Sequence, residues 1–139
     1  MSMQHYPVDN YGLYLDFETL KHMACKACKD CTPEAFEEDE WFYLNELYEM
    51  GHVDYMSEFT GEAIAIQDTG EPMWGVPHEV YSYDTCWYAP AWKQTRMFGA
   101  AYENMDELIA EFRDRIGEYL PDDFDYRKNL CLVCGTYFG

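Results

Sequence analysis

The spacing between apolar residues changes along the N-terminal part of the chain, and this change limits the possible folds. In the segment YGLYLDF, residues 11–17, apolar side chains occupy every second position, as in a β-strand with one buried face. From Asp16 to Cys31 they recur three and four residues apart, which predicts an amphipathic helix. Its expected buried stripe consists of Leu20, Met23, Ala24, Ala27, Cys28 and Cys31.

A second helix is predicted between Thr32 and Gly51. Thr32 can cap the helix, Pro33 suits its first turn, and Gly51 suits its C-terminal end. The apolar residues of this segment are again spaced for one helix face. They are Phe36, Tyr43, Leu44 and Leu47.

The remainder of the chain is predicted to be rich in strands, with one further helix. Strands are expected at 52–59, 62–68, 78–88, 92–102 and 129–139. Thr60-Gly61 suggests a hairpin turn between the first two of these strands, and residues 68–72 suggest another turn. Asn104 resembles the first residue of a capping box, followed by a helix that Pro121 stops. Its apolar stripe is Met105, Leu108, Ile109, Phe112 and Ile116.

These segments predict an α+β fold, with about three helices packed on an antiparallel β-sheet. A chain of 139 residues has the size of one domain, so we expect a single compact domain over residues 1–139. Aromatic residues form 18% of the chain, which excludes a disordered acidic tail. The sequence shows neither a signal peptide nor an apolar stretch long enough to span a membrane, so we expect a cytosolic protein.

The net charge of −18 is large for a chain of this length. Residues 30–92 contain 15 acidic residues and neither Lys nor Arg. Nucleic acids and anionic membranes would be repelled by such a surface, so we expect neither as a direct ligand. A basic protein would be attracted, and its association would be accelerated.

The acidic residues of the second predicted helix form the candidate partner-binding site. No Lys or Arg lies within this segment, so its charge is not compensated locally. Carboxylates three and four residues apart on a helix are spaced similarly to the phosphates of a nucleic-acid strand. In the first turn they also stabilise the helix dipole, but near the C-terminal end they oppose it. The candidate residues are Glu34, Glu37, Glu38, Asp39, Glu40, Glu46 and Glu49.

The six cysteines allow three interpretations, which are buried free thiols, a structural zinc site, and redox or iron–sulfur chemistry. Cys25, Cys28 and Cys31 are spaced by three residues, Cys131 and Cys134 form a second C-x-x-C element, and Cys86 stands alone. Two such elements can hold a structural zinc ion, with His22 as a further ligand. About a hundred residues separate them, however, and apolar helix positions favour buried free thiols. We therefore expect no metal and no cofactor.

The sequence lacks the common catalytic motifs. His78 belongs to HEVYS, which lacks the second histidine of a zinc-protease motif, and no nucleophile elbow, phosphate loop or dinucleotide fingerprint is present. Cys86 and His78 could form a nucleophile–base pair, but any six Cys and four His offer such pairs, so the sequence leans against an enzyme. A separate aromatic set is expected to pack in the core and sheet, with some members as interface anchors. It comprises Trp74, Tyr81, Tyr83, Trp87, Tyr88 and Trp92.

In size, charge and lack of catalytic motifs, the chain looks like the small acidic proteins that mobile elements use against restriction or CRISPR nucleases. The leading hypothesis is therefore an acidic inhibitor of a basic nucleic-acid-binding enzyme, of the anti-CRISPR, anti-restriction or nuclease-immunity type. Its acidic surface would mimic nucleic acid. The alternative is a zinc-stabilised adaptor or regulatory module that uses the C-x-x-C elements.

Overall fold

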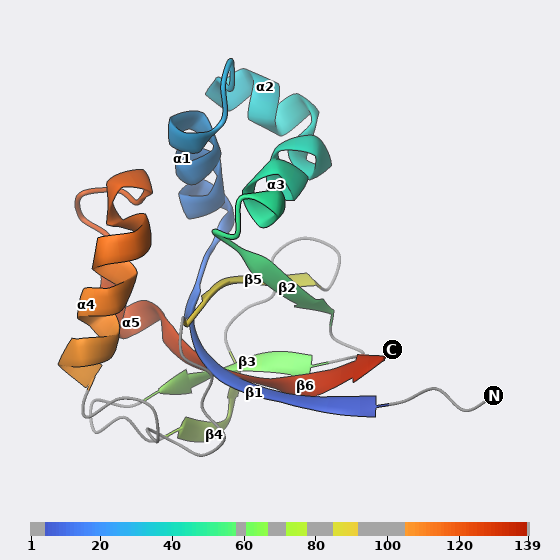
Figure 1. Cartoon of the computed structure of the whole chain (residues 1–139), viewed down its shortest axis with the longest axis vertical. Helices are drawn as coiled ribbons and strands as arrows, with labels where there is room; N and C mark the ends of the chain where they lie inside the picture. The colour runs from blue at the N-terminus through green and yellow to red at the C-terminus, as the bar shows by residue number, and fades with distance from the viewer. Residues whose placement is uncertain (1–4, 58–60, 67–71, 78–84, 92–104, 139) are drawn as a thin grey trace.

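A computed structural model describes residues 5–57, 61–66, 72–77, 85–91 and 105–138 (Figure 1). Within these residues the chain forms six strands, five α-helices and a 3₁₀ turn, η1, at Gly117–Tyr119. The helices are α1 Phe17–Ala27, α2 Pro33–Glu38, α3 Glu40–Glu49, α4 Met105–Ile116 and α5 Tyr126–Asn129. The strands are β1 His5–Tyr14, β2 Asp54–Ser57, β3 Gly61–Ile66, β4 Pro72–Pro77, β5 Thr85–Pro90 and β6 Leu130–Phe138.

All six strands belong to one sheet in the order β2-β5-β1-β6-β3-β4, and all pairings are antiparallel. The long central pair, β1 and β6, runs in register from His5 opposite Phe138 to Leu13 opposite Leu130. The expected mixture of helices with an antiparallel sheet is therefore confirmed. Three of the helices, α1, α3 and α4, have ten or more residues.

The main core lies between the sheet and the helices, where α1, α2 and α3 gather at one end and η1, which follows α4, contacts α1 (Figure 1). Alternation along β1 sends Tyr11 and Leu13 into this core, as predicted. The helices add the buried stripes of α1 and α4, which confirms the predicted periodicity there. These helical residues are Leu20, Met23, Ala24, Leu108, Ile109, Phe112 and Ile116.

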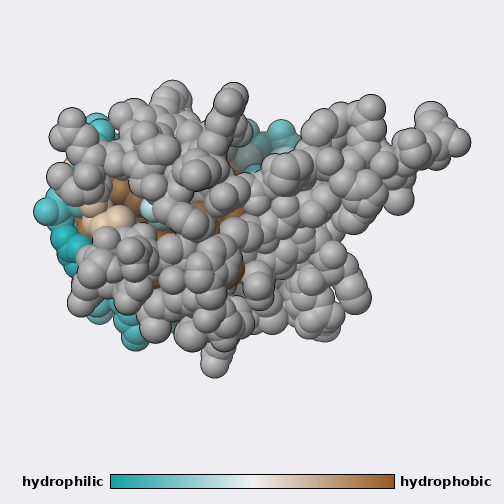
Figure 2. All heavy atoms as spheres, turned by 90° about the horizontal axis from the view of Figure 1, so that it is seen from below, coloured by the Kyte–Doolittle hydropathy of each residue, from teal (hydrophilic) through white to brown (hydrophobic). Residues whose placement is uncertain are grey.

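The opposite face of the sheet carries a second, smaller apolar cluster. It contains Tyr88, Cys131 and Val133, with Tyr14 packed against them. Gly12 lies on this face, and a Cβ added there would meet Tyr88 Cδ2 at 2.9 Å. Viewed from below, hydrophobic residues are visible between hydrophilic residues at one end of the molecule (Figure 2).

Two predicted helices differ from the expectation, since the first ends early and the second is divided in two. The first stops at Ala27, because Cys28 takes an extended conformation and Asp30 a left-handed one with φ of 60°. Cys31 therefore lies outside the helix. The second is interrupted at Asp39, whose φ of −144° and ψ of 63° are not helical, so the single helix predicted over 32–51 is wrong. The predicted start is confirmed, since Thr32 Oγ1 accepts from Ala35 N at 3.1 Å.

The predicted hairpin between the strands at 52–59 and 62–68 is also wrong. β2 pairs with β5, whereas β3 pairs with β6 and β4, and three strands separate β2 from β3 in the sheet. β2 instead places Tyr55 opposite Trp87, and an aromatic cross-strand pair of this kind contributes about 0.2–1 kcal/mol to a sheet. The closing strand expected at 129–139 is confirmed by β6.

Several predicted features lie outside the described residues: the turn at 68–72, residues 78–84, the strand at 92–102, and Asn104. In the part of the chain that the structure describes, no helix meets the length and apolarity that crossing a bilayer requires.

Candidate partner-binding surface

The predicted acidic residues lie on two consecutive helices rather than on one. The side chains of this set are exposed except for Glu40, which is half-buried. Because α2 and α3 are separated at Asp39, the carboxylates form two groups and not the single straight row that one helix would provide. The first group is Glu34, Glu37 and Glu38; the second is Glu40, Glu46 and Glu49, with Asp39 between them.

One of these carboxylates is compensated by a cation from another helix. Lys21 Nζ on α1 lies 3.2 Å from both Glu37 Oε1 and Glu18 Oε2. The hydrogen bond from Lys21 to Glu37, followed by the one to Glu18, raises the pKa of Lys21. The expectation that the acidic segment has no counter-charge is therefore wrong for Glu37. Sequence-local reasoning could not find this pair, because it joins residues sixteen positions apart.

The C-terminal part of α3 retains uncompensated charge. Glu46 and Glu49 lie in its last two turns, and no basic residue occupies its last turn. Their position opposes the helix dipole, which favours cations at a C-terminal end. Within the described residues neither side chain is recorded in an ion pair. The charge of this surface is therefore available to an external cation.

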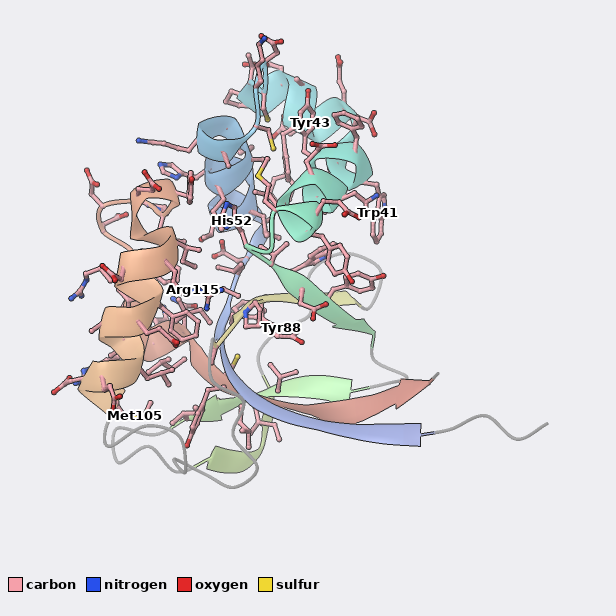
Figure 3. The ribbon with its side chains drawn as sticks, in the orientation of Figure 1. Trp41, Tyr43, His52, Tyr88, Met105 and Arg115 are labelled. Carbon is pink, nitrogen blue, oxygen red and sulfur yellow. The ribbon has the colours of Figure 1, made fainter. Side chains whose placement is uncertain are left out.

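Exposed aromatic residues lie directly beside the acidic ones, and the sequence analysis did not single them out as a site. Trp41 is 48% exposed, Tyr48 39% and Tyr55 44%. Trp41 and Tyr48 are seven residues apart, which places them on one flank of α3. Figure 3 shows Trp41 on the side of α3 remote from α1. The sequence signal for this site was the seven-residue spacing of two aromatic residues outside the buried stripe of Leu44 and Leu47.

The aromatic residues expected to pack in the sheet behave as predicted where they are described. Trp87 is 1% exposed and Tyr88 3% exposed, and they point to opposite faces of β5. Trp92, Tyr81 and Tyr83 lie outside the described residues, and the structure describes only the backbone of Trp74.

The edge strand β2 carries a carboxylate, that of Asp54, which accepts a hydrogen bond from the backbone of the next residue. Asp54 Oδ1 accepts from Tyr55 N at 2.8 Å. Burial raises the pKa of Asp54, while hydrogen bonds from Tyr55 N and the Tyr88 hydroxyl lower it in part. Because the Tyr55 amide already has this acceptor, it is less available to an added strand.

The cysteines fall into separate environments. Cys28 is in the main core and Cys131 in the cluster on the other face of the sheet, and both thiols are buried, as expected. Cys25 Sγ lies 3.8 Å from Cys31 Sγ. Burial raises the pKa of Cys28, with a smaller contribution from Glu46, and burial together with the contact to Cys25 raises the pKa of Cys31 to about 12.

This separation weighs against a zinc site that joins the two C-x-x-C elements. Cys28 and Cys131 belong to different apolar clusters, on opposite faces of the sheet. Among the residues that the structure describes, no three His, Cys, Asp or Glu side chains are grouped as metal ligands. The Cys86 and Cys134 side chains lie outside the described part.

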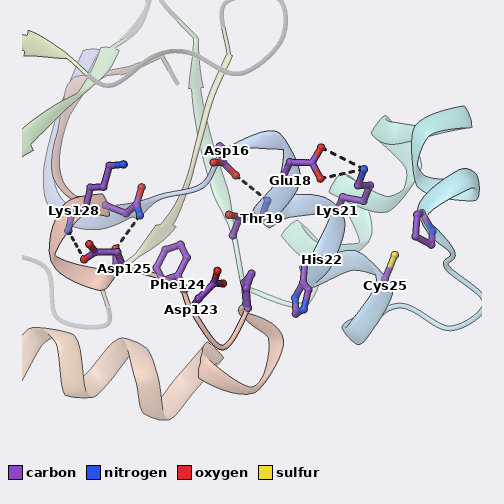
Figure 4. Close-up of a pocket in the computed structure, with 13 residues that line it drawn as sticks. Asp16, Glu18, Thr19, Lys21, His22, Cys25, Asp123, Phe124, Asp125 and Lys128 are labelled. Atoms are coloured by element: carbon purple, nitrogen blue, oxygen red, sulfur yellow. Dashed lines mark hydrogen bonds and ion pairs between the residues drawn. The ribbon is translucent and has the colours of Figure 1, made fainter.

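A groove of about 550 Å³ lies between α1 and the segment from Pro121 to Asn129 (Figure 4). Several of its polar side chains already have structural roles. Asp16 caps α1 by accepting from Thr19 N at 2.8 Å, and Asp125 caps α5 by accepting from Lys128 N at 3.1 Å. Two acidic residues of the groove are thus helix caps, and His22, Cys25 and Asp123 also line it.

The two histidines whose side chains are described also have structural partners. His22 Nδ1 lies 2.9 Å from the Tyr119 carbonyl oxygen, and since a carbonyl only accepts, this nitrogen donates. The His52 ring packs 4.8 Å from the Tyr119 ring. Burial lowers the pKa of His52, as does the positive charge of Arg115. The predicted alternative Cys86–His78 pair lies outside the described side chains.

Comparison with protein-family models, with curated proteins and with solved structures gives no match. The fold and surface therefore define this chain only as an α+β protein with an acidic, aromatic-flanked face. The functional argument rests on the geometry of that face.

Proposed function

We propose that this protein inhibits a basic nucleic-acid-binding enzyme by occupying its cationic cleft with the α2–α3 surface. The observation that carries this proposal is the exposed, largely uncompensated carboxylate set on those two helices. A net charge of −18 would accelerate association with a cationic protein and repel competing polyanions. Anti-CRISPR, anti-restriction and nuclease-immunity proteins are the classes to which this mode of action belongs.

We propose that the protein mimics the charge of nucleic acid, with carboxylates on helices that are anchored by buried side chains. Phe36 holds α2 through a fully buried ring, and Leu44 and Leu47 hold α3. Because α2 and α3 are packed, binding costs little ordering of the backbone that carries the carboxylates, while each immobilised side chain costs about 0.5–1.5 kcal/mol. Arginine side chains that bind phosphates accept carboxylates with similar geometry. We expect a soluble cytosolic encounter, without a membrane or a direct nucleic-acid ligand.

The test compares two triple variants of equal net charge. The site variant neutralises Glu38, Glu46 and Glu49 to Gln, and the control variant neutralises the exposed Asp114, Asp122 and Asp123 to Asn. Affinity capture from the native host, followed by mass spectrometry, should recover a basic nucleic-acid-binding protein with the wild type and the control variant. The site variant should lose it, and added duplex DNA should compete.

Salt dependence provides the second measurement. Binding to the captured protein should weaken steeply as salt rises, because the attraction is electrostatic. The proposal fails if both triple variants weaken binding equally, since net charge alone would then be responsible. It also fails if the site variant binds the captured protein as tightly as the wild type does.

A further inference from the structure

The exposed aromatic residues of α3 and β2 form a supported layer, here called the aromatic shelf: Trp41, Tyr48 and Tyr55. Trp87 lies beneath them, and its ring centroid is 5.0 Å from that of Tyr55 and 5.8 Å from that of Trp41. The Tyr48 and Tyr55 rings are 5.8 Å apart. Each shelf residue thus contacts another aromatic ring while leaving two-fifths to one-half of its surface in water.

The shelf is held by regular secondary structure. Tyr55 pairs directly across the sheet with Trp87, which is itself 1% exposed. Trp41 and Tyr48 are on a helix anchored by Leu44 and Leu47. Large exposed aromatic groups on rigid elements bind partners at low entropic cost, and monomeric proteins rarely leave such groups clustered in water.

The chemistry around the shelf favours a cation. The faces of aromatic rings carry negative electrostatic potential and attract cations. On α3, Glu49 follows Tyr48 directly and lies about a quarter turn around the helix from the flank of Trp41 and Tyr48, on the flank of Phe42. Among the described residues, the recorded cation–π contacts are Lys21 over Phe17 and Arg113 over Tyr126, and neither involves the shelf.

We infer that the aromatic shelf receives arginine side chains of the basic partner, an inference that rests on the proposed function and specifies its contact chemistry. The planar guanidinium stacks on aromatic faces and simultaneously donates to carboxylates such as Glu49. A lysine ammonium is more strongly hydrated and lacks this planar surface. The inhibitor therefore distinguishes arginine-rich from lysine-rich surfaces, which charge mimicry alone would not do.

Two other occupants fit the observations less well. A second copy of this chain would bring a charge of −18 against an equal charge, which opposes association. A strand added to the edge of β2 would need backbone donors, yet Tyr55 N is already bonded to Asp54 Oδ1. β2 also has only four residues.

The test uses a poly-arginine peptide and a poly-lysine peptide of equal length as probes, measured by calorimetry with the full-length protein. The shelf variant combines Trp41→Leu with Tyr48→Leu. The matched control is Phe42→Leu, which alters a 53% exposed aromatic residue on another flank of the same helix. Circular dichroism checks that each variant is folded, and Tyr55→Thr tests the shelf independently through β2.

Wild type and the Phe42→Leu control should bind poly-arginine more tightly than poly-lysine, by about fivefold or more. The shelf variant and Tyr55→Thr should reduce this preference while affinity for poly-lysine changes little. The site triple variant defined above should weaken binding of both peptides.

Equal binding of both peptides by the wild type would overturn the inference, as would an unchanged preference in the two shelf-directed variants. If only the site triple variant weakens binding, the shelf inference fails and the proposed function stands. If that triple variant binds both peptides as the wild type does, the proposed function fails. A wild-type dimer that the shelf variant converts to a monomer would identify a second copy as the occupant and also overturn the inference.

Discussion

Phe36 fixes the short helix that carries the first group of carboxylates, so its replacement by alanine should destabilise the protein substantially. The ring is fully buried, and its centroid lies 5.7 Å from that of Phe17 and 6.3 Å from that of Tyr43. Deleting a buried phenylalanine side chain costs about 3–5 kcal/mol, including the cavity that remains. For a chain of 139 residues, the unfolding free energy is on the order of 7–20 kcal/mol. The variant should therefore fold, with reduced stability.

The assay is urea unfolding followed by circular dichroism, with Phe42→Ala as the matched control. Phe42 loses the same atoms but is 53% exposed, so we expect a cost below about 1 kcal/mol. Hydrogen exchange should show the largest loss of protection in α2, because six residues do not form a stable helix without packing. Equal costs for the two variants would refute the reasoning, as would a cost below about 1.5 kcal/mol for Phe36→Ala.

Two further predictions concern a close backbone approach and a histidine. Gly12→Ala should lower the free energy of unfolding by about 1–3 kcal/mol, because the new Cβ would meet the Ala89 carbonyl oxygen at 3.0 Å. Thermal unfolding measures this effect. Gly117→Ala is a milder control, because the nearest neighbours of its Cβ are side-chain atoms at 3.3 Å. Equal effects of the two substitutions would contradict it. Burial lowers the pKa of His52 below its ordinary 6.5. On acidification the unfolded state therefore binds the proton first, and the free energy of unfolding decreases as the pH falls below about 6.5. His52→Gln should flatten this part of the curve in unfolding experiments from about pH 5 to about pH 8; an unchanged slope would show that His52 is not responsible.

The acidic surface was predictable from sequence because charge requires no knowledge of distant contacts. Polar side chains on a helix with a defined buried stripe must lie on its exposed side, and Glu38, Glu46 and Glu49 do. The geometry of this surface was harder to predict from the sequence. Neither Gly nor Pro marks the helix break at Asp39, so the local sequence pattern predicted one continuous helix.

The aromatic shelf depends still more on tertiary structure. Tyr55 and Trp87 are separated by more than thirty residues in the chain, and they meet because β2 pairs with β5. The turn signal at Gly61 instead suggested that β2 pairs with β3. A turn propensity concerns a few residues, whereas strand order is decided by the apolar area that a whole sheet buries.

The sequence by itself determined the mixed α+β composition, the buried faces of β1, α1 and α4, and the surplus of negative charge. These properties follow from residue spacing and side-chain chemistry, which act over one or two turns of the backbone. Only the tertiary structure decided the strand order, the pairing of Lys21 with Glu37, and the stacking of Trp41 and Tyr55 over Trp87. The physical reason is that these contacts join distant segments, and their partners are chosen by the packing of the complete core.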